Sequence, residues 1–210
     1  MFLARTAQRV TMPAGKCFIE DGSAAVYFYN INRGSVRLFK SLPDGRRQIT
    51  GFASAGDFLG LAVGGNYAFN AEAMGDVELC RFNRLALREV FGEFPALERR
   101  LLDVATHELV IAQEQMLLLG RKTALERVAS FLLAWAERQQ MCPAGGLPKA
   151  MQVMALPMSR MDLADYLGVT IETVSRSFSR LKRDGMIDFS NAQDVTLVLP
   201  HQLSDLAQAA

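Results

Sequence analysis

The sequence predicts a mixed α+β protein with an N-terminal β-barrel or jelly roll, one long helix and a C-terminal winged helix-turn-helix. Three observations lead to this prediction. Short runs rich in β-branched and aromatic residues alternate with turn signals from Gly15 to about Phe82. A heptad pattern follows Pro95, and two short amphipathic helices joined by a glycine are expected between Ser159 and Gly185. The expected domains are residues 1–94, 95–120 and 121–210.

The N-terminal region contains the turn signals of a compact antiparallel β structure. They are Asp21-Gly22, Asn32-Arg33-Gly34, Pro43-Asp44-Gly45, Gly56-Asp57 and Gly64-Gly65-Asn66. Strand candidates at residues 26–29 and 35–39 flank one of these turns. Residues 43–46 lie between two further strand candidates, as a hairpin loop should. Many short strands with frequent turns favour a closed sheet or a jelly roll.

Composition limits the class of protein. The chain has 210 residues, of which 50% are hydrophobic, so it can bury a sizeable core. Its net charge is +1. Arg5 and Arg9 interrupt the N-terminal apolar residues, and no apolar run approaches the roughly 18 residues of a membrane span. Cys17, Cys80 and Cys142 form no CxxC pair, which fits a reducing compartment. We therefore predict a globular protein of the cytoplasm.

The helix after Pro95 has two apolar faces. The first repeats at heptad spacing and is expected to meet the same helix of a second subunit. Its residues are Leu102, Ala105, Leu109, Ala112, Met116 and Leu119. The second face is expected to rest on the β-domain and contains Leu101, Val104, Ile111 and Leu118. An intramolecular core that covers both faces is the alternative.

Gly120 is a candidate hinge between this helix and the next one. A new amphipathic helix is expected from Thr123 to about Gln139. The segment 141–149, with two prolines and a Gly-Gly pair, is expected to be a loop that closes this element.

Capping and periodicity predict the helix-turn-helix. Ser159 followed three residues later by Asp162 is typical of a capping box. The apolar stripe of this helix is Met161, Leu163, Ala164 and Leu167, and the helix is expected to end at Gly168. Thr170 can cap a second helix, whose inward face is Val174, Phe178 and Leu181. The runs 186–190 and 194–198 are typical of a small β-hairpin, which completes a winged helix-turn-helix.

The second helix has an uneven distribution of charge. With its apolar residues turned inward, the side chains that project outward are Glu172, Ser175, Arg176, Ser179 and Arg183. In a major groove, Arg binds guanine O6 and N7, and Glu accepts a hydrogen bond from cytosine N4. Glu172 would weaken simple phosphate binding, so we interpret it as a base-reading residue. The later cations Arg180, Lys182 and Arg183 suit phosphates. A merely solvated face is the alternative.

The stretch LPMSRMDLADYLGVTIETVSRSFSRLKRDGMI resembles the DNA-binding motif of the CRP/FNR superfamily of bacterial transcription regulators. MPAGKCFIEDG, NINRGSVRLFK and AGDFLGL resemble the cyclic-nucleotide-binding-like β-roll of that family, and MLLLGRKTALERVASFL resembles the end of its dimerisation helix. The resemblance covers nearly the whole chain. The pattern E-x-x-S-R at Glu172, Ser175 and Arg176 is similar to the FNR and FixK-type branch.

The resemblance implies a homodimer that binds a TTGA-containing palindrome in double-stranded DNA. Glu172 and Arg176 would read the G·C pair of each half-site, and Ser175 would distinguish the neighbouring thymine. The expected phosphate-binding residues are Ser159, Arg160, Thr170, Thr173, Ser179, Arg180, Lys182 and Arg183. Activation through RNA polymerase, in low-oxygen or redox-linked control, is also implied, and residues 43–47 are a candidate polymerase surface. A repressor of the same fold that responds to an unidentified small ligand is the alternative.

No cyclic nucleotide is expected to bind. A cyclic phosphate needs a cation, because a buried unpaired anion is strongly disfavoured. No Lys or Arg occurs between Gly60 and Gly75, and Phe69-Asn70 stands where cAMP-binding relatives carry an Arg-Ser pair. Glu72 lies nearby.

No metal cofactor and no enzyme activity are predicted either. An iron–sulfur cluster needs four thiolates, and the N-terminal cysteine cluster of FNR is absent. Cys80 is therefore expected to pack in the core, and Cys17 alone cannot replace the cluster. The only histidines are His107 and His201, so no haem is assigned, and a cupin-type metal site lacks its ligands. A hydrolase is not indicated, because no GxSxG elbow or Ser/His/Asp set occurs.

Overall fold

The structure is a computed structural model, and it describes residues 7–62, 65–86, 92, 94–139, 146–191 and 193–208. The chain divides into two compact units, Met1–Ile111 and Ala112–Ala210. The long helix α3 (Pro95–Arg121) contributes to both units. Cys142 and Arg5, which the sequence analysis uses, lie outside the described residues.

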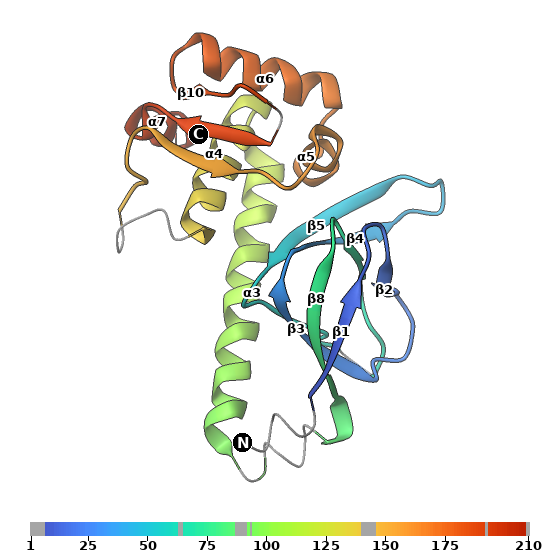
Figure 1. Ribbon diagram of the computed structural model, residues 1–210. Coiled ribbons are helices and arrows are strands. Elements are labelled where there is room, and N and C mark those ends of the chain that lie inside the picture. Colours follow the sequence, from blue (N-terminus) through green and yellow to red (C-terminus); the bar gives the residue numbers. More distant parts are fainter. Residues whose placement is uncertain are drawn as a thin grey trace. The chain divides into compact units, whose positions relative to one another are not determined.

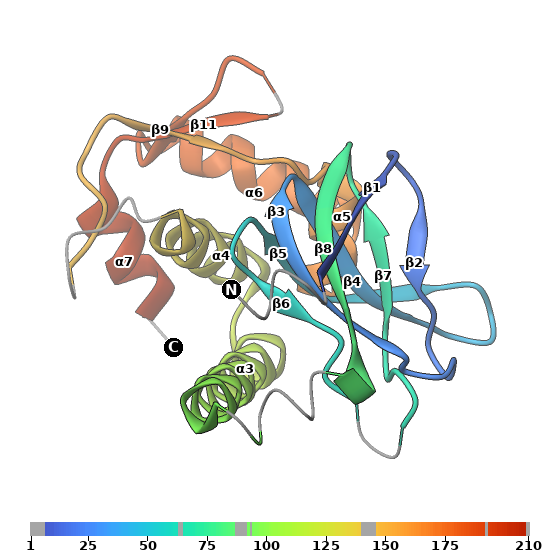
Figure 2. The ribbon, with the colours of Figure 1, turned by 60° about the horizontal axis from the view of Figure 1, so that its bottom comes forward.

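The first unit is built from eight described strands (Figure 1). They are β1 (Ala7–Met12), β2 (Cys17–Ile19), β3 (Tyr27–Arg33), β4 (Ser35–Ser41), β5 (Arg47–Ser54), β6 (Phe58–Leu59), β7 (Asn70–Ala73) and β8 (Val77–Asn83). One antiparallel sheet has the order β1-β8-β3-β6, and the other has the order β2-β7-β4-β5. Figure 2 shows both sheets. The predicted β-roll is confirmed.

Alternating side chains fill the interior of the roll. Along β8, Val77 and Leu79 are buried whereas Glu78 is exposed, because successive side chains of a strand point to opposite faces. The buried cluster contains Ile19, Ala25, Tyr29, Ile31, Val36, Ala53, Leu59, Tyr67, Ala71, Ala73, Val77 and Leu79. Its members are apolar apart from two tyrosine hydroxyls. The interior described by these residues therefore carries no cation.

Glycines form two of the predicted turns. The hairpin loop before Arg47 is confirmed: β4 and β5 pair with Ser41 opposite Arg47, and Gly45 has a φ of +87°. The strands that flank Gly34 do not pair with each other, because β3 and β4 lie in different sheets. Gly34 has a φ of +93°, and a Cβ at this position would lie 2.6 Å from the Asp76 carbonyl oxygen. Only glycine fits this passage from one sheet to the other.

The second unit is a winged helix-turn-helix that packs on the helix after α3. Its elements are α4 (Ala124–Arg138), β9 (Gln152–Ala155), α5 (Arg160–Leu167), α6 (Ile171–Arg183), β10 (Ile187–Asp188), β11 (Asp194–Leu197) and α7 (Pro200–Gln208). The predicted hairpin is confirmed as β10 and β11, but β9 pairs with β11 as a third strand. Neither β9 nor α7 is predicted from the sequence. Of the expected loop, residues 141–145 lie outside the described part.

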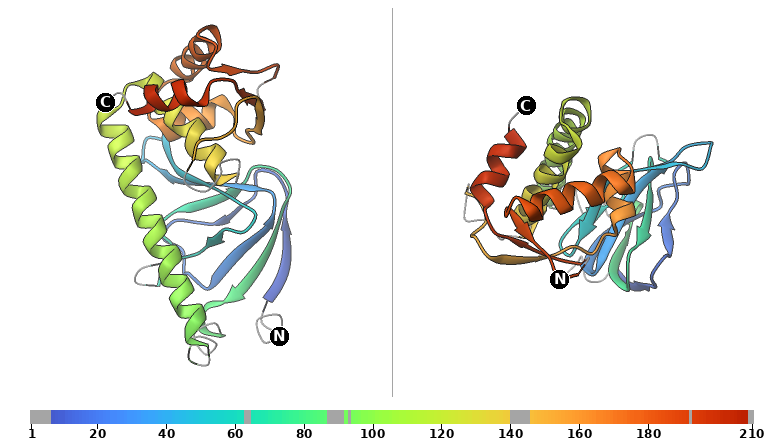
Figure 3. Two further views of the ribbon diagram at one scale, coloured as in Figure 1. Left: turned by 90° about the vertical axis from the view of Figure 1, so that its left-hand side faces the viewer. Right: turned by 90° about the horizontal axis from the view of Figure 1, so that it is seen from above.

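Helix α3 runs without interruption from Pro95 to Arg121 (Figure 3). Its two apolar faces differ in burial, as predicted. On the second face Leu118 is buried, and Leu101, Val104 and Ile111 are half-buried. Leu101 and Val104 line a cleft of about 490 Å³ together with Phe58 and Phe82 of the roll. This face therefore rests in part on the β-domain, in agreement with the prediction.

The heptad face of α3 is largely exposed. Leu109 and Met116 are 59% and 74% exposed, and Leu102 and Ala112 are exposed as well. Two predicted members differ, because Ala105 and Leu119 are half-buried. The intramolecular alternative for this face is disfavoured.

Gly120, the candidate hinge, lies in the last turn of helix α3. Helix α3 continues through this residue to Arg121, and only Lys122 and Thr123 separate it from α4. The capping box of Thr123 and Glu126 starts the new helix. The break between the helices therefore lies after Gly120, because Thr123, three residues later, caps α4 and determines where it begins.

Candidate nucleic-acid interface

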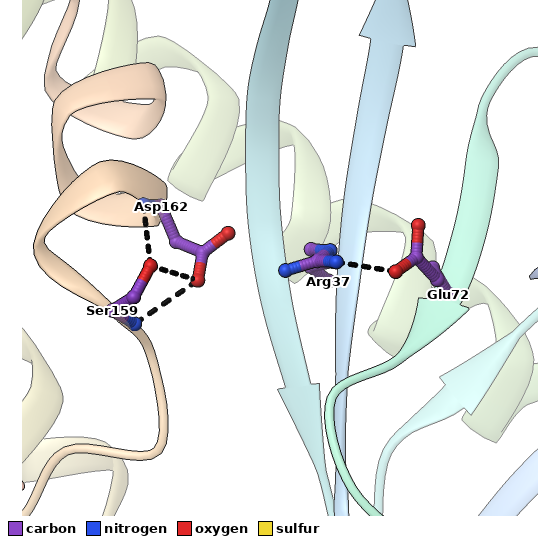
Figure 4. A network of polar contacts seen from close by, with 4 residues as sticks. All are labelled: Arg37, Glu72, Ser159 and Asp162. Carbon is purple, nitrogen blue, oxygen red and sulfur yellow. Dashed lines mark hydrogen bonds and ion pairs between the residues drawn. The ribbon is translucent and has the colours of Figure 1, made fainter. Parts of the chain in front are cut away.

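The first helix of the helix-turn-helix begins at a complete capping box, as predicted (Figure 4). The Ser159 hydroxyl accepts a hydrogen bond from the Asp162 backbone N–H at 3.1 Å, and it donates to the Asp162 carboxylate at 2.7 Å. The same carboxylate accepts from the Ser159 backbone N–H at 3.0 Å. The Ser159 hydroxyl thus already donates its proton to the Asp162 carboxylate. It would have to break this hydrogen bond to donate to a DNA phosphate.

The apolar stripe predicted for α5 is wrong at one position. Leu163, Ala164 and Leu167 are buried, but Met161 is 49% exposed and Asp162 is 3% exposed. The carboxylate can occupy the buried position because the cap satisfies it with hydrogen bonds.

A tight turn joins α5 to α6. Gly168 ends α5 in the left-handed conformation with a φ of +64°. The Thr170 hydroxyl then accepts from the Thr173 backbone N–H at 3.2 Å and caps α6. Both features are as predicted. The inward face of α6 is also confirmed, since Val174, Phe178 and Leu181 are buried.

The N-terminal half of α6 exposes the predicted base-reading residues. Glu172, Ser175 and Arg176 are exposed, and no ion pair of Arg176 is recorded within the described chain. The pKa of Glu172 lies below its usual value, because its own backbone N–H and the Thr170 hydroxyl donate to the carboxylate, and Arg176 adds a smaller attraction. Glu172 is therefore an ionised acceptor at neutral pH. The Ser175 hydroxyl donates to the Ile171 carbonyl oxygen at 2.9 Å, so it must rotate to reach a base.

The cations in the last turn of α6 already have acidic neighbours. Arg180 and Arg183 lie 3.6 Å and 3.8 Å from the Asp184 carboxylate. Lys182 Nζ lies 2.6 Å from the Asp188 carboxylate, and hydrogen bonding to Lys182 lowers the pKa of Asp188. These pairs are exposed and contribute little to stability. Phosphates can therefore replace the carboxylates at small cost.

A cleft of about 290 Å³ separates α6 from the wing. Its lining residues are Arg160, Ser175, Phe178, Ser179, Phe189, Ser190 and Asn191. The Arg160 guanidinium lies over the Phe178 ring, 3.4 Å from its centroid. Arg160 Nη1 is buried and has no hydrogen-bond partner among the described residues, and burial lowers the pKa of Arg160. A cation with an unused donor in an open cleft is suited to an anion.

The structure thus groups the predicted DNA-binding residues in three places. The base-reading residues lie with Thr170 and Thr173 on the first turns of α6. Arg160 and Ser179 line the cleft, whereas Arg180, Lys182 and Arg183 occupy the last turn. The wing residues Phe189, Ser190 and Asn191 also line this cleft and are not among the predicted DNA-binding residues. A polar pair directly after an aromatic residue in the hairpin is the only local signal for them.

The roll residues that could hold a cyclic phosphate are used otherwise. Asn70 donates to the Phe39 carbonyl oxygen at 3.3 Å and accepts from the Asp21 backbone N–H at 3.1 Å. Arg37 pairs with Glu72 across β4 and β7 (Figure 4). Both residues alternate with buried neighbours along their strands, so they lie on the face away from the interior of the roll. Arg37 and Glu72 therefore do not face the interior of the roll.

The two described cysteines are thiols with local hydrogen bonds. Cys80 is half-buried on the face opposite Leu79, and its Sγ accepts from Asn32 Nδ2 at 3.2 Å. The expected core packing of Cys80 is therefore wrong, because strand alternation places Leu79 inside. Burial raises the pKa of the Cys17 thiol, with Glu20 as the next cause. The described residues contain no cluster of three or more His, Cys, Asp or Glu side chains that could hold a metal.

Comparison with known proteins agrees with this architecture. Residues 9–94 match the cyclic nucleotide-binding domain, and residues 126–206 match the Crp-like helix-turn-helix domain. The chain is 44% identical over 202 residues to the nitrogen fixation regulation protein FixK of Bradyrhizobium diazoefficiens, which covers 96% of this chain and 83% of that protein. This chain belongs to the CRP/FNR family. It is a DNA-binding transcription regulator of the FixK type.

Another relative and two solved structures are also similar to this chain. The transcriptional activatory protein AadR of Rhodopseudomonas palustris is 44% identical over 183 residues, 87% of this chain and 74% of that protein. The structure of FixK2 from Bradyrhizobium japonicum superposes with a TM-score of 0.87 at 40% identity, over 97% of this chain and 98% of that one. A CooA mutant from Carboxydothermus hydrogenoformans shares the fold, with a TM-score of 0.83 at 18% identity, over 99% and 91% of the chains.

No described helix of this FixK-type regulator combines the length and the apolar character needed to cross a bilayer.

Proposed function

We propose that this protein is a cytoplasmic transcription activator that binds a TTGA-containing palindrome as a homodimer. One observation carries the proposal: Glu172 and Arg176 stand exposed one helical turn apart on the first half of α6. The similar protein AadR is named a transcriptional activatory protein, which supports activation. The cytoplasm is proposed because bacterial DNA is the expected partner. Low-oxygen or redox-linked control is part of the same proposal.

The three exposed side chains divide the reading of one half-site. Arg176 donates to guanine O6 and N7, and the ionised Glu172 accepts from the paired cytosine N4. Ser175 lies between them and faces the neighbouring thymine. The low pKa of Glu172 supports its role, because only the ionised carboxylate is a pure acceptor.

The remaining polar residues hold the backbone of the DNA. A phosphate at the cleft would receive hydrogen bonds from Arg160 and Ser179, and Ser190 and Asn191 would approach it from the wing. Thr170 and Thr173 suit a phosphate at the N-terminus of α6, where the helix dipole favours negative charge. Ser159 is the weakest member of this set because its hydroxyl already serves the cap. Arg180, Lys182 and Arg183 suit phosphates on the other side.

Dimerisation through the heptad face of α3 completes the proposal. Its exposed apolar residues are Leu102, Leu109, Ala112 and Met116, with Ala105 and Leu119 at the edges. Pairing of two such helices would bury these residues. Two recognition helices about 34 Å apart then match successive major grooves on one face of the duplex.

We propose no catalytic role and no bound cyclic nucleotide, iron–sulfur cluster or haem. The outward position of the Arg37–Glu72 pair and the high pKa of Cys17 support this part. RNA polymerase is the expected protein partner. The hairpin at residues 43–47 is a candidate contact surface, and its residues 43–46 are exposed.

The base-reading assignment is tested by Arg176→Ala. The specific affinity should fall by about 1–3 kcal/mol because one bidentate base contact is lost, whereas non-specific affinity should be nearly unchanged. Gel-shift titrations on palindromic and scrambled duplexes measure both. Arg183→Ala is the matched control, and it should weaken both duplexes alike. Equal losses on both duplexes for Arg176→Ala would refute the assignment.

A further inference from the structure

Arg127, in the first turn of α4, donates hydrogen bonds to three different backbone carbonyls. Its Nη1 lies 2.7 Å from the Leu167 oxygen, and its Nη2 lies 2.9 Å from the Leu119 oxygen. Its Nε lies 2.9 Å from the Lys122 oxygen. The side chain is half-buried, so all three bonds are partly shielded from water. One guanidinium therefore connects three separate points of the chain.

The three carbonyls lie where helices end. Leu119 belongs to the last turn of α3, Leu167 is the last residue of α5, and Lys122 lies between α3 and α4. Carbonyls at the C-terminal end of a helix lack a partner within the helix and carry the negative end of the helix dipole. A cation stabilises them, and the fixed fork of a guanidinium can reach three at once. The compact ammonium of lysine cannot reproduce this geometry.

Further contacts join the same segments. Gln115 Nε2 donates to the Tyr166 backbone carbonyl oxygen at 3.0 Å, which is a second link between α3 and the end of α5. The Leu119 side chain lies against Gly168, where an added Cβ would be 3.4 Å away. Lys122 Nζ donates to Ser130 Oγ at 2.9 Å and to the Ala207 oxygen at 2.6 Å. Lys122, in the connection between α3 and α4, is therefore hydrogen-bonded through its side chain and also through its carbonyl oxygen, which accepts from Arg127.

We propose that Arg127 is a positioning residue that joins the last two turns of α3 to the helix-turn-helix as one rigid body. The separation of the two recognition helices is then set by the paired α3 helices and not by a flexible linker. This inference rests on the proposed function as a dimer on palindromic DNA. Its consequence is a strict spacing of half-sites, because each added base pair moves a half-site by about 3.4 Å and rotates it around the duplex.

The test compares palindromes with the preferred spacing and with one base pair added or removed. The wild type should bind the preferred spacing far better than the altered ones. Arg127→Gln should bind the preferred operator about tenfold more weakly, the loss expected for one charge-assisted hydrogen bond, and should discriminate less between spacings. Arg121→Gln removes an exposed charge from the same junction and should behave as the wild type. Ultracentrifugation and thermal melting monitor dimerisation and folding.

Each outcome decides one question. If folded, dimeric Arg127→Gln keeps the spacing discrimination of the wild type, the positioning role is refuted. If Arg127→Gln does not melt cooperatively, Arg127→Lys decides in its place, since it keeps the charge but not the three-way geometry. Gln115→Ala should show a smaller loss of discrimination in the same direction. A wild type that does not prefer the palindrome over scrambled DNA would instead refute the proposed function.

Discussion

At the scale of single residues, several side chains that we propose to face DNA already make local hydrogen bonds or ion pairs in the free protein. Ser175 donates to a helix carbonyl, Lys182 pairs with Asp188, and Ser159 serves its cap. Binding therefore exchanges hydrogen bonds instead of creating them, and each exchange contributes only about 0.5–1.5 kcal/mol. Arg160 and Arg176 differ, because each keeps donors without a recorded partner in the described chain. We expect these two arginines to contribute most.

A second residue-scale prediction concerns Tyr29 in the interior of the roll. Burial, with the neighbouring Tyr67 as the next cause, raises the pKa of Tyr29 to about 12 from 10.0. The fold favours the neutral phenol, so its stabilisation is complete below pH 10 and is lost as the pH rises toward 12. Between pH 8 and pH 11.5 the free energy of unfolding should fall by about 2 kcal/mol less in Tyr29→Phe than in the wild type.

Urea unfolding at the two pH values measures this difference. Tyr166→Phe is the parallel variant in the second unit, where burial also raises the pKa of the tyrosine to about 12. If Tyr29→Phe loses as much stability at high pH as the wild type does, the Tyr29 hydroxyl of the wild type ionises as freely in the folded protein as in the unfolded chain.

At the scale of elements, α3 carries out two tasks with two faces. On its half-buried face, Leu101 and Val104 line a cleft together with roll residues, while Leu109 and Met116 stay open to solvent. Large exposed apolar side chains at heptad spacing are costly in an isolated subunit and typical of a coiled-coil seam. The last turn of the same helix is bonded to Arg127. In the proposed dimer, one element thus connects dimerisation with the placement of the recognition helix.

Replacing Leu109 or Met116 with Asp should break the dimer. Each change places a charge in the middle of the seam, and we expect subunit dissociation to be favoured at least about 100-fold, the size of a desolvated unpaired charge at an interface. Specific DNA binding should be lost with it. Analytical ultracentrifugation measures the first effect and gel shifts measure the second.

Val110→Asp is the control for the seam. Val110 is exposed beside Leu109 but points about 100° away from it around the helix. This variant should remain dimeric. Dissociation by Val110→Asp with an intact Leu109→Asp dimer would mean that a different face of α3 forms the interface.

At the scale of the whole molecule, a roll that matches the cyclic nucleotide-binding domain is joined to a DNA-binding unit, and the described buried cluster of this roll offers no cation to a cyclic phosphate. The buried cluster of the roll contains no cation, and Arg37 points away from it. The fold of the roll therefore does not by itself imply its ligand. In this chain the roll supplies a surface on which α3 rests.

The corresponding prediction is that cAMP does not bind measurably. A buried cyclic phosphate without a cation would be strongly disfavoured, so calorimetric titration should show no heat beyond dilution. The DNA affinity should likewise not change when cAMP is added. A micromolar dissociation constant by calorimetry would contradict the prediction.

Much of the fold and most of the recognition helix follow from the sequence, because their signals are local. The caps at Ser159 and Thr170, the turn at Gly168 and the inward face of α6 all depend on residues within a few positions of each other. Such spacings specify backbone geometry directly. The exposed positions of Glu172 and Arg176 follow from the same periodicity.

Only the tertiary structure decided the features that join distant segments. The strand β9 enters the wing by pairing with β11, about 40 positions along the chain, and Cys80 leaves the core because Leu79 takes the inward position. The cleft at Arg160 needs a helix and a hairpin to meet, and Arg127 needs the ends of two other helices. Long-range contacts of this kind leave no periodic signal, because their partners are selected by packing in space and not by spacing along the chain.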